Sequence, residues 1–424
     1  MKLIYLVLDG ASDGLIEKTA LKAAYKPGLD SIAPKSLCGL MYTIGKGIAP
    51  ESDSAVLSIL GYDPHKYYTG RGPLEALGAG MRIREGYEVA FRANFATVDP
   101  QTMRIIDRRC GRDLRSEEAK ELAEALDGMD LGTYDGYVRV KATIGHRAVV
   151  IIGSRSLNLS GNVSNTDPAY VKKGLISVAA KSYEMKVSKC EPLDDTPEAS
   201  RTARLTNIFT RKAIQILDEH PLNLRREREG RLKANAVLLR DSGDRLPRVE
   251  PIGTKFNRSF SAIVEMPVEK GIARLLEMRV AEAPPPTGVR AKDYAIRLEA
   301  TLRLLKENDV VYVHLKGPDE PGHDGDFQGK VKALEDIDKY FVIPLLGRID
   351  LDSTAILVTS DHSTPWTLRT HSDAPVPVLL YVPGVKGDGF NKFCEENCAK
   401  GSLGLIEHGW LLLPKVFEVM KEKR

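Results

Sequence analysis

The sequence lacks the features that would place it in a membrane or on nucleic acid. Its 424 residues contain no apolar run near the roughly 20 residues that span a bilayer. The 61 Lys and Arg residues are nearly balanced by 58 Asp and Glu, and a net charge of +3 gives no general affinity for nucleic acid or membrane surfaces. The apolar N-terminal stretch meets Asp9 too early for a secretory signal peptide, so we expect a cytoplasmic protein.

Cysteine is also scarce. The 5 cysteines are an odd, scattered set, which predicts reduced thiols and not a disulfide framework. Cys394 and Cys398 have no second Cys/His pair near them to complete a zinc quartet. Internal repeats and low-complexity tracts are absent as well. What remains is a globular composition, 42% apolar and 28% charged, with a length that suits roughly two or three domains.

Short apolar, β-branched runs alternate with helical patterns in the C-terminal part of the chain. They predict buried strands at 309–315, 355–359 and 376–382, with one helix at 294–306 before the first strand and another at 328–341 before the second. Such alternation is typical of an α/β fold, in which helices cover both faces of a mainly parallel sheet. Between about residues 80 and 250 the pattern changes to strand pairs joined by turns.

Acids and histidines follow the predicted strands of the α/β part. They are Asp9, Asp319, His323, Asp361, His362 and His371. Open α/β sheets bind ligands outside the carboxyl ends of their strands. Three carboxylates and three imidazoles at that edge suffice for two metal ions, and these donors suit manganese, zinc, iron or cobalt better than magnesium. The alternative is a set of solvated turns with incidental histidines, because Asp, Ser, Thr and Pro are ordinary turn residues.

A second pattern concerns the segment between Asp319 and His323. Its proline and glycine predict a loop that folds back onto one ion, and not the face of a helix.

A serine cluster precedes a short apolar helical run. Ser52 and Ser54 fit the position of an N-terminal helix cap. The alternative is a nucleophilic serine at a helix N-terminus, where free amides and the helix dipole favour a phosphate. Paired metal ions would give that serine a role, since direct coordination can deprotonate it without a histidine base.

Taken together, these motifs resemble the alkaline phosphatase superfamily, and more closely its archaeal-type cofactor-independent phosphoglycerate mutases. The resemblance spans nearly the whole chain. It rests on Glu51–Ala55, Leu57–Pro64, Gly70-Arg71-Gly72, Phe91–Thr97, Asp107–Arg112, Gly145–Ala148, Asp319-x-x-x-His323-Asp324-Gly325, Asp361–Thr364 and His371-Ser372. It implies an alkaline-phosphatase-like α/β domain formed by residues 1–79 and 250–424, interrupted by an inserted α+β domain at 80–249 that binds and covers the substrate.

The resemblance also implies the roles of individual residues. One ion would be held by Asp319, His323 and His371, and the other by Asp9, Asp361, His362 and the nucleophile Ser52. Lys270 would lie near the phosphate. The candidate ligands of the substrate's phosphate and carboxylate, groups that a planar guanidinium binds bidentately, are Arg240, Arg147 and Arg109. Two divalent ions are expected, with manganese in first place and zinc, cobalt or magnesium as alternatives.

The implied activity is the interconversion of 3-phosphoglycerate and 2-phosphoglycerate in glycolysis and gluconeogenesis. It would proceed through a phosphoserine, without a bisphosphoglycerate cofactor. A metal-dependent phosphatase or phosphosugar mutase of the same superfamily is the alternative. The expected partner is the small-molecule phosphoglycerate, with no nucleic acid and no membrane, and the sequence leaves the oligomeric state open.

Overall fold

The computed structural model describes residues 1–284 and 286–421. The chain forms two compact units. The first contains Met1–Tyr67, Val249–Glu265 and the residues from Ile272 onwards, and the second contains Tyr68–Arg248 and Met266–Gly271. None of the helices in the described ranges combines the length and the apolar character that crossing a bilayer requires.

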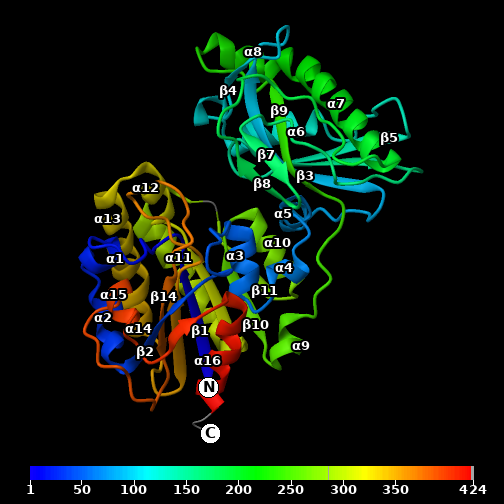
Figure 1. Cartoon of the computed structure of the whole chain (residues 1–424). Coiled ribbons are helices and arrows are strands. Elements are labelled where there is room, and N and C mark those ends of the chain that lie inside the picture. The colour runs from blue at the N-terminus through cyan, green and yellow to red at the C-terminus, as the bar shows by residue number, and fades with distance from the viewer. Residues whose placement is uncertain (285, 422–424) are drawn as a thin grey trace. The chain divides into compact units, whose positions relative to one another are not determined.

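The first unit is built on an eight-stranded sheet (Figure 1). In spatial order its strands are β11 (Arg279–Glu282), β10 (Phe260–Val264), β12 (Val310–Leu315), β1 (Lys2–Leu8), β13 (Thr354–Thr359), β14 (Val376–Tyr381), β2 (Ser36–Met41) and β15 (Gly404–Ile406). The first five strands in this order, β11, β10, β12, β1 and β13, pair in parallel. Strand β14 is antiparallel to both of its neighbours and so runs against the rest of this sheet. The predicted mainly parallel sheet is confirmed.

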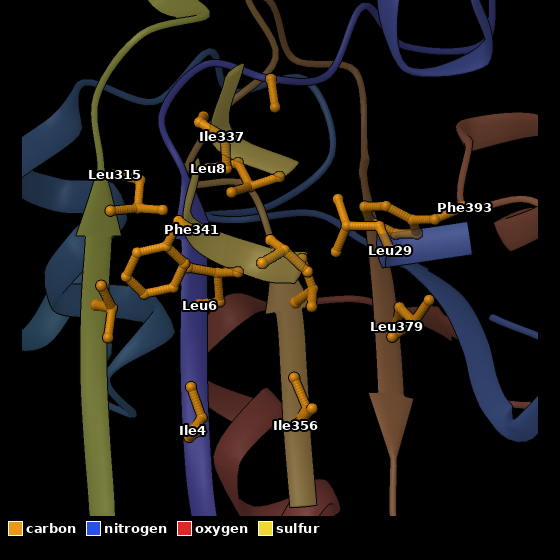
Figure 2. Close-up of a cluster of buried hydrophobic side chains, with 14 of the residues drawn as sticks. Ile4, Leu6, Leu8, Leu29, Leu315, Ile337, Phe341, Ile356, Leu379 and Phe393 are labelled. Carbon is orange, nitrogen blue, oxygen red and sulfur yellow. The ribbon is translucent and has the colours of Figure 1, made fainter. Parts of the chain in front are cut away.

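Alternate residues of the central strand β1 face opposite layers of helices. Ile4, Leu6 and Leu8 belong to an apolar cluster that Figure 2 shows, together with side chains from α2 (Pro27–Ile32) and α13 (Phe327–Ile337). On the other face, the Tyr5 hydroxyl donates to the carbonyl oxygen of Ile59 in α3 (Ser52–Ile59) at 3.1 Å. Each fully buried aliphatic side chain of such a layer contributes about 1.5–3 kcal/mol. Helices therefore cover both faces, as expected.

The other helices of the first unit lie around this sheet. They are α1 (Ala20–Ala23), α4 (Pro64–Tyr67), α9 (Ile252–Phe256), α11 (Arg290–Glu307), α12 (Asp319–Asp324), α14 (Ile343–Leu346), α15 (Glu395–Cys398) and α16 (Leu412–Lys421). Helix α10 (Pro267–Leu275) begins in the second unit and ends in the first.

The predicted loop between Asp319 and His323 is wrong, because this segment is the short helix α12. Pro321 lies in the first turn, where the missing N–H would have no intrahelical partner in any case. Gly325 ends the helix with φ +73°, the left-handed conformation that glycine adopts most readily. Asp319 and His323 are consequently one helical turn apart on the same face.

The second unit is built on an antiparallel sheet. Its strands are β3 (Glu88–Val98), β4 (Ile105–Asp107), β5 (Gly136–Ala142), β6 (Arg147–Ser154) and β9 (Ala236–Gly243), with a separate hairpin of β7 (Tyr170–Lys173) and β8 (Ile176–Ala179). Its helices are α5 (Arg71–Gly78), α6 (Ser116–Glu124), α7 (Pro197–Asp218) and α8 (Pro221–Arg228). The assignment of 80–249 as an inserted substrate-binding domain remains a prediction, which the separate compactness of this unit supports.

Candidate metal centre and anion-binding cluster

The acidic and imidazole side chains predicted as metal ligands gather at the carboxyl end of the first unit's sheet. Asp9 follows β1, and Asp361 and His362 follow β13. Asp319 and His323 are on α12, just after β12, and His371 lies in the loop before β14.

Two of the carboxylates each have one oxygen that accepts no hydrogen bond from the described residues. Asp361 accepts hydrogen bonds through Oδ1 from the backbone N–H groups of Gly10 and His362, at 3.0 and 3.1 Å. Asp9 uses Oδ2 in an ion pair of 2.6 Å with Lys316. The buried oxygens Asp361 Oδ2 and Asp9 Oδ1 accept no hydrogen bond from the described residues. A buried unsatisfied acceptor costs about 1–3 kcal/mol, so both oxygens are suited to a cation.

Two histidines have their proton placed by a backbone acceptor. His323 Nδ1 is 3.2 Å from the carbonyl oxygen of Arg369, and His371 Nδ1 is 2.9 Å from that of Pro50. A carbonyl oxygen only accepts, so each Nδ1 carries the hydrogen. In the neutral ring the Nε2 lone pair then faces Asp319 Oδ1, at 3.5 Å from His323 and 3.6 Å from His371. An imidazole that binds a metal through one ring nitrogen usually donates the N–H of its other nitrogen to such an acceptor.

The third predicted histidine, His362, has the proton on its Nδ1 placed by a hydroxyl group and not by a carbonyl. Thr364 Oγ1 donates its single hydrogen to Asp319 Oδ1 at 2.8 Å, so it accepts from His362 Nδ1 at 2.9 Å. In the neutral ring, the lone pair on His362 Nε2 then faces Asp9 Oδ1 at 3.4 Å and Asp361 Oδ2 at 3.3 Å. Three electron-rich atoms at these separations need a cation among them.

The spacing of the donor atoms fits metal coordination. Neighbouring ligand atoms are 3.3–3.6 Å apart, and donors at corners of a tetrahedron with bonds of about 2.0–2.2 Å have this separation. Asp319, His323 and His371 form one compact group. Asp9 takes part in two others, one with Asp319 and His362 and one with Asp361 and a histidine that the sequence analysis did not single out, His314. The residues therefore fit divalent metal ions.

The pKa values show how the protein compensates for this crowding of charge. Burial and the Asp9 carboxylate act to raise the pKa of Asp319, but His371 and His362 outweigh them and hold it at about 2. Burial acts to lower the pKa of His362, but Asp361, Asp9 and Asp319 raise it to about 9. Without a metal ion, a proton on His362 supplies part of the positive charge that the carboxylates require.

Ser52 is the first residue of α3 and lies beside this group of ligands. Its Oγ is 3.4 Å from His362 Nε2. The interpretation of Ser52 and Ser54 as helix caps is wrong, because Glu51 occupies the cap position and Ser54 Oγ donates to the Glu51 carbonyl oxygen. Ser52 is thus placed beside both the ligands and the free amides of a helix N-terminus.

Two neighbours of the metal ligands, one buried and one partly exposed, were missed by the sequence analysis. His314 lies within β12, level with Val7 of β1, and Lys316 follows this strand. The signal was a single histidine in the apolar run Val310–Leu315, which by itself indicates only a buried strand.

A buried ion pair holds the loops that support the ligands. Lys330 of α13 pairs with Asp13 at 2.6 Å, and both side chains are fully buried. The same ammonium group donates to the carbonyl oxygens of Ser12 and Thr364 at 3.1 and 2.8 Å. It therefore joins the loop after β1 to the loop after β13, where Thr364 orients His362.

Lys330→Met is expected to lower the free energy of unfolding by about 3–5 kcal/mol, because it leaves Asp13 as a buried, unpaired charge. The matched control is Lys332→Met on the same helix. Lys332 is 61% exposed and pairs with Asp336 four residues on, so its loss should leave the free energy of unfolding nearly unchanged. Urea denaturation of the two variants gives the comparison, and equal losses would contradict the buried-pair argument.

The second unit carries a separate cluster of arginines on one face of its sheet. Arg92 of β3 lies directly opposite Arg240 of β9, and Asn94 lies opposite Arg147 of β6. Residues two apart on a strand share a face, so these three arginines lie on the same face. Like charges directly opposite each other destabilise a sheet. This arrangement is therefore typical of a surface that binds an anion.

Helix α5 adds charges to the same face. Glu75 pairs with Arg71 at 2.8 Å and with Arg92 at 3.4 Å. Burial, Arg71 and Arg240 lower the pKa of Arg92 to about 9, and its buried Nε donates no hydrogen bond to the described residues. An anion placed here would relieve the repulsion among the guanidinium groups.

An acidic side chain and an aromatic ring contact Arg240 in this cluster. Asp167 accepts two hydrogen bonds from Arg108, at 3.0 and 2.7 Å, and one from Arg240 at 3.4 Å. The Tyr170 ring lies 4.1 Å from the Arg240 guanidinium. The ring and the carboxylate fix the orientation of Arg240.

The remaining predicted substrate residues lie in the same unit. Burial and the charges of Arg147 and Arg109 lower the pKa of His146 to about 4, so the fields of both arginines reach this imidazole. Lys270 lies on α10 next to Gly271, where a Cβ would come 1.8 Å from the carbonyl oxygen of Leu74 in α5. The two helix backbones touch there, so Lys270 lies beside α5.

Comparison with known proteins places this chain among relatives of one family. The family model of the 2,3-bisphosphoglycerate-independent phosphoglycerate mutases matches residues 33–223. The protein of that name from Aeropyrum pernix is 48% identical over 99% of this chain and 100% of its own length, and one from Archaeoglobus fulgidus is 40% identical over 95% and 94%. A solved cofactor-independent phosphoglycerate mutase from Thermoplasma acidophilum has a TM-score of 0.64 and 32% identity, covering 99% of this chain and 100% of its own. The predicted family and fold class are confirmed. The chain belongs to the family of 2,3-bisphosphoglycerate-independent phosphoglycerate mutases.

Proposed function

We propose that this protein interconverts 3-phosphoglycerate and 2-phosphoglycerate through a phosphoserine at Ser52. The Ser52 oxygen forms a bond to phosphorus while the bond from phosphorus to the glycerate oxygen breaks, and that oxygen takes up a proton. The other glycerate hydroxyl then attacks the phosphoserine and regenerates the free serine. No bisphosphoglycerate is needed, because the transferred group stays on the enzyme between the two steps.

The single observation that supports this proposal is the position of Ser52. Its Oγ lies 3.4 Å from His362 Nε2, in a cluster where Asp361 Oδ2 and Asp9 Oδ1 are buried and accept no hydrogen bond from the described residues. A cation bound by these side chains would also be coordinated by the Ser52 hydroxyl. The N-terminal amides of α3 face the same place and suit a phosphoryl group.

We assign one ion to Asp319, His323 and His371, and a second to Asp9, Ser52, Asp361 and His362. Manganese fits these mixed oxygen and nitrogen donors best, and zinc, cobalt or magnesium are the other candidates. When bound, such ions favour the deprotonated serine and neutralise charge on the phosphoryl oxygens.

The arginine cluster of the second unit supplies groups for the substrate's anionic ends. Arg240 and Arg147 present planar guanidinium groups from neighbouring parts of one sheet face, which suits a carboxylate or phosphate. We add Arg92 and Arg71 to the predicted set because they crowd the same face. Arg109 and Lys270 remain in that set as candidates.

Product analysis tests the function directly. The full-length protein, loaded with Mn²⁺ and given only 3-phosphoglycerate, should produce 2-phosphoglycerate and reach the same mixture from either substrate, as followed by ³¹P NMR. A phosphatase would release inorganic phosphate, and a phosphosugar mutase would leave both phosphoglycerates unchanged. Either outcome would overturn the proposal.

Arg240→Met should lower kcat/KM for 3-phosphoglycerate by about 10- to 150-fold, which corresponds to the 1.5–3 kcal/mol of a charged hydrogen bond. Most of the loss should appear in KM, because the guanidinium binds groups that persist through the reaction. Arg245→Met is the matched control, since Arg245 follows β9 and is 59% exposed. Equal effects of the two substitutions would remove Arg240 from the substrate site.

A further inference from the structure

His314 lies beside the proposed metal ligands, although neither the motifs nor the assigned ligand set includes it. The side chain is fully buried near the end of β12. Its Nε2 is 3.5 Å from Asp361 Oδ2 and 3.9 Å from Asp9 Oδ1. These are the same two oxygens that accept no hydrogen bond from the described residues.

Hydrogen bonds from His314 Nε2 to these two oxygens do not account for the two distances. An N–H···O hydrogen bond has its heavy atoms about 2.7–3.2 Å apart. Both separations from His314 Nε2 are longer than this. Separations near 3.5 Å are instead those between two donors on one ion, as already seen for His362 and the same two carboxylates.

The other ring nitrogen has a partner suited to a metal-binding imidazole. His314 Nδ1 is 3.1 Å from the Tyr312 hydroxyl, which can accept from Nδ1–H and leave the Nε2 lone pair facing the carboxylates. The Tyr312 ring packs edge-on against Tyr5 at 5.2 Å, and the Tyr5 hydroxyl is fixed on Ile59. The orientation of His314 is therefore determined through two buried tyrosines.

We propose that His314 is a further ligand of the ion held by Asp9 and Asp361. This inference rests on the proposed metal site and extends its ligand set. With Ser52 and His362 the ion would have five protein donors, a number that suits manganese or cobalt better than tetrahedral zinc. A neutral nitrogen also adds a donor without adding negative charge to a site that already contains two acids.

Metal binding by the full-length, metal-free protein tests the proposal without substrate. The variants are His314→Asn and His314→Gln. Asparagine can retain the contact with Tyr312 but has no atom at the position of Nε2, whereas glutamine can place an amide oxygen near that position. Calorimetric titration of wild-type protein with Mn²⁺ should show two classes of site. The Asn variant should weaken one class at least about 10-fold and leave the other unchanged, with the Gln variant in between.

Two further measurements make the result decisive. The visible absorption spectrum of the Co²⁺-loaded protein should change in both variants, because an imidazole donor is lost. His65→Asn is the matched control, since His65 packs against Trp410 and is outside the three groups of potential ligands. Folded variants with wild-type Mn²⁺ affinities and an unchanged Co²⁺ spectrum would overturn the assignment, and if the Asn variant fails to fold, the Gln spectrum decides. A wild-type protein that binds no ion would instead refute the proposed function.

Discussion

Ser52→Ala is expected to abolish mutase activity, with a fall in kcat of at least about 10⁴-fold, as is usual when a covalent nucleophile is removed. The reason is positional. Ser52 Oγ lies among the metal ligands at the start of α3, and the alanine variant leaves no oxygen there to accept the phosphoryl group. The loss should persist at saturating Mn²⁺ and substrate, because the substitution leaves the proposed substrate-binding arginines in place. The assay is the conversion of 3-phosphoglycerate to 2-phosphoglycerate by metal-loaded protein.

Ser54→Ala is the control for this substitution, on the same helix two residues away. Ser54 Oγ donates to the Glu51 carbonyl oxygen at 3.0 Å and is not among the ligands, so this variant should keep most of the activity. Rapidly quenched wild-type protein should carry one phosphoryl group, which peptide mass spectrometry would place on Ser52. Retention of activity by Ser52→Ala, or a phosphoryl group on Ser54, would contradict the assigned nucleophile.

The central strands of the first unit's sheet could be predicted because they are buried on both faces. Such strands are continuous apolar runs, as in Ala355–Thr359, and each ends where polar side chains begin. The helix α12 could not be predicted in the same way. Proline and glycine inside a short segment normally indicate a loop, yet Pro321 falls in the one turn of a helix that tolerates it.

Helix α5 could not be predicted for a related reason. Gly70, Gly72 and Pro73 are residues typical of a turn, so this stretch carries no clear signal for the helix Arg71–Gly78. In the structure this helix packs on β3 of the second unit, through close backbone approach at Gly72 to Ala90. That contact depends on residues far from this stretch in the sequence.

The ligands were predictable and the residues around them were not. Asp9 and Asp361 come at the ends of apolar runs that predict strands, which is a local sequence signal. His314 interrupts a strand whose neighbours are all buried, and its closeness to the carboxylates depends on the pairing of β12 with β1. Arg92 and Arg240 likewise become neighbours only through the register of β3 and β9. Pairing between distant strands is not encoded in a single segment.

Adding Mn²⁺ to the metal-free protein is expected to raise its thermal unfolding temperature, and the increase should grow with pH. At a free metal concentration of about 1,000 times Kd, binding contributes about 4 kcal/mol. The pH dependence arises from His362, whose pKa is raised to about 9 in the metal-free fold, above the ordinary value of about 6.5. Thermal unfolding with excess chelator or excess Mn²⁺, from pH 7 to pH 9, gives the measurement.

The direction of the pH effect follows from that raised pKa. A group with a raised folded pKa stabilises the fold fully below its unfolded pKa, and this contribution is lost as the pH rises through the folded value. The metal-free protein should therefore lose stability between about pH 6.5 and 9. Asp319 adds nothing in this window, because its pKa is lowered to about 2 and its contribution is lost only as the pH falls towards that value. In the metal-loaded protein the ion replaces the proton on His362, so the stability of that form should not decline over the same range. Metal binding should also release about one proton from His362 near pH 7 and almost none from this residue well above pH 9. A temperature increase that is constant from pH 7 to pH 9, with no proton release, would show that His362 does not bind the ion.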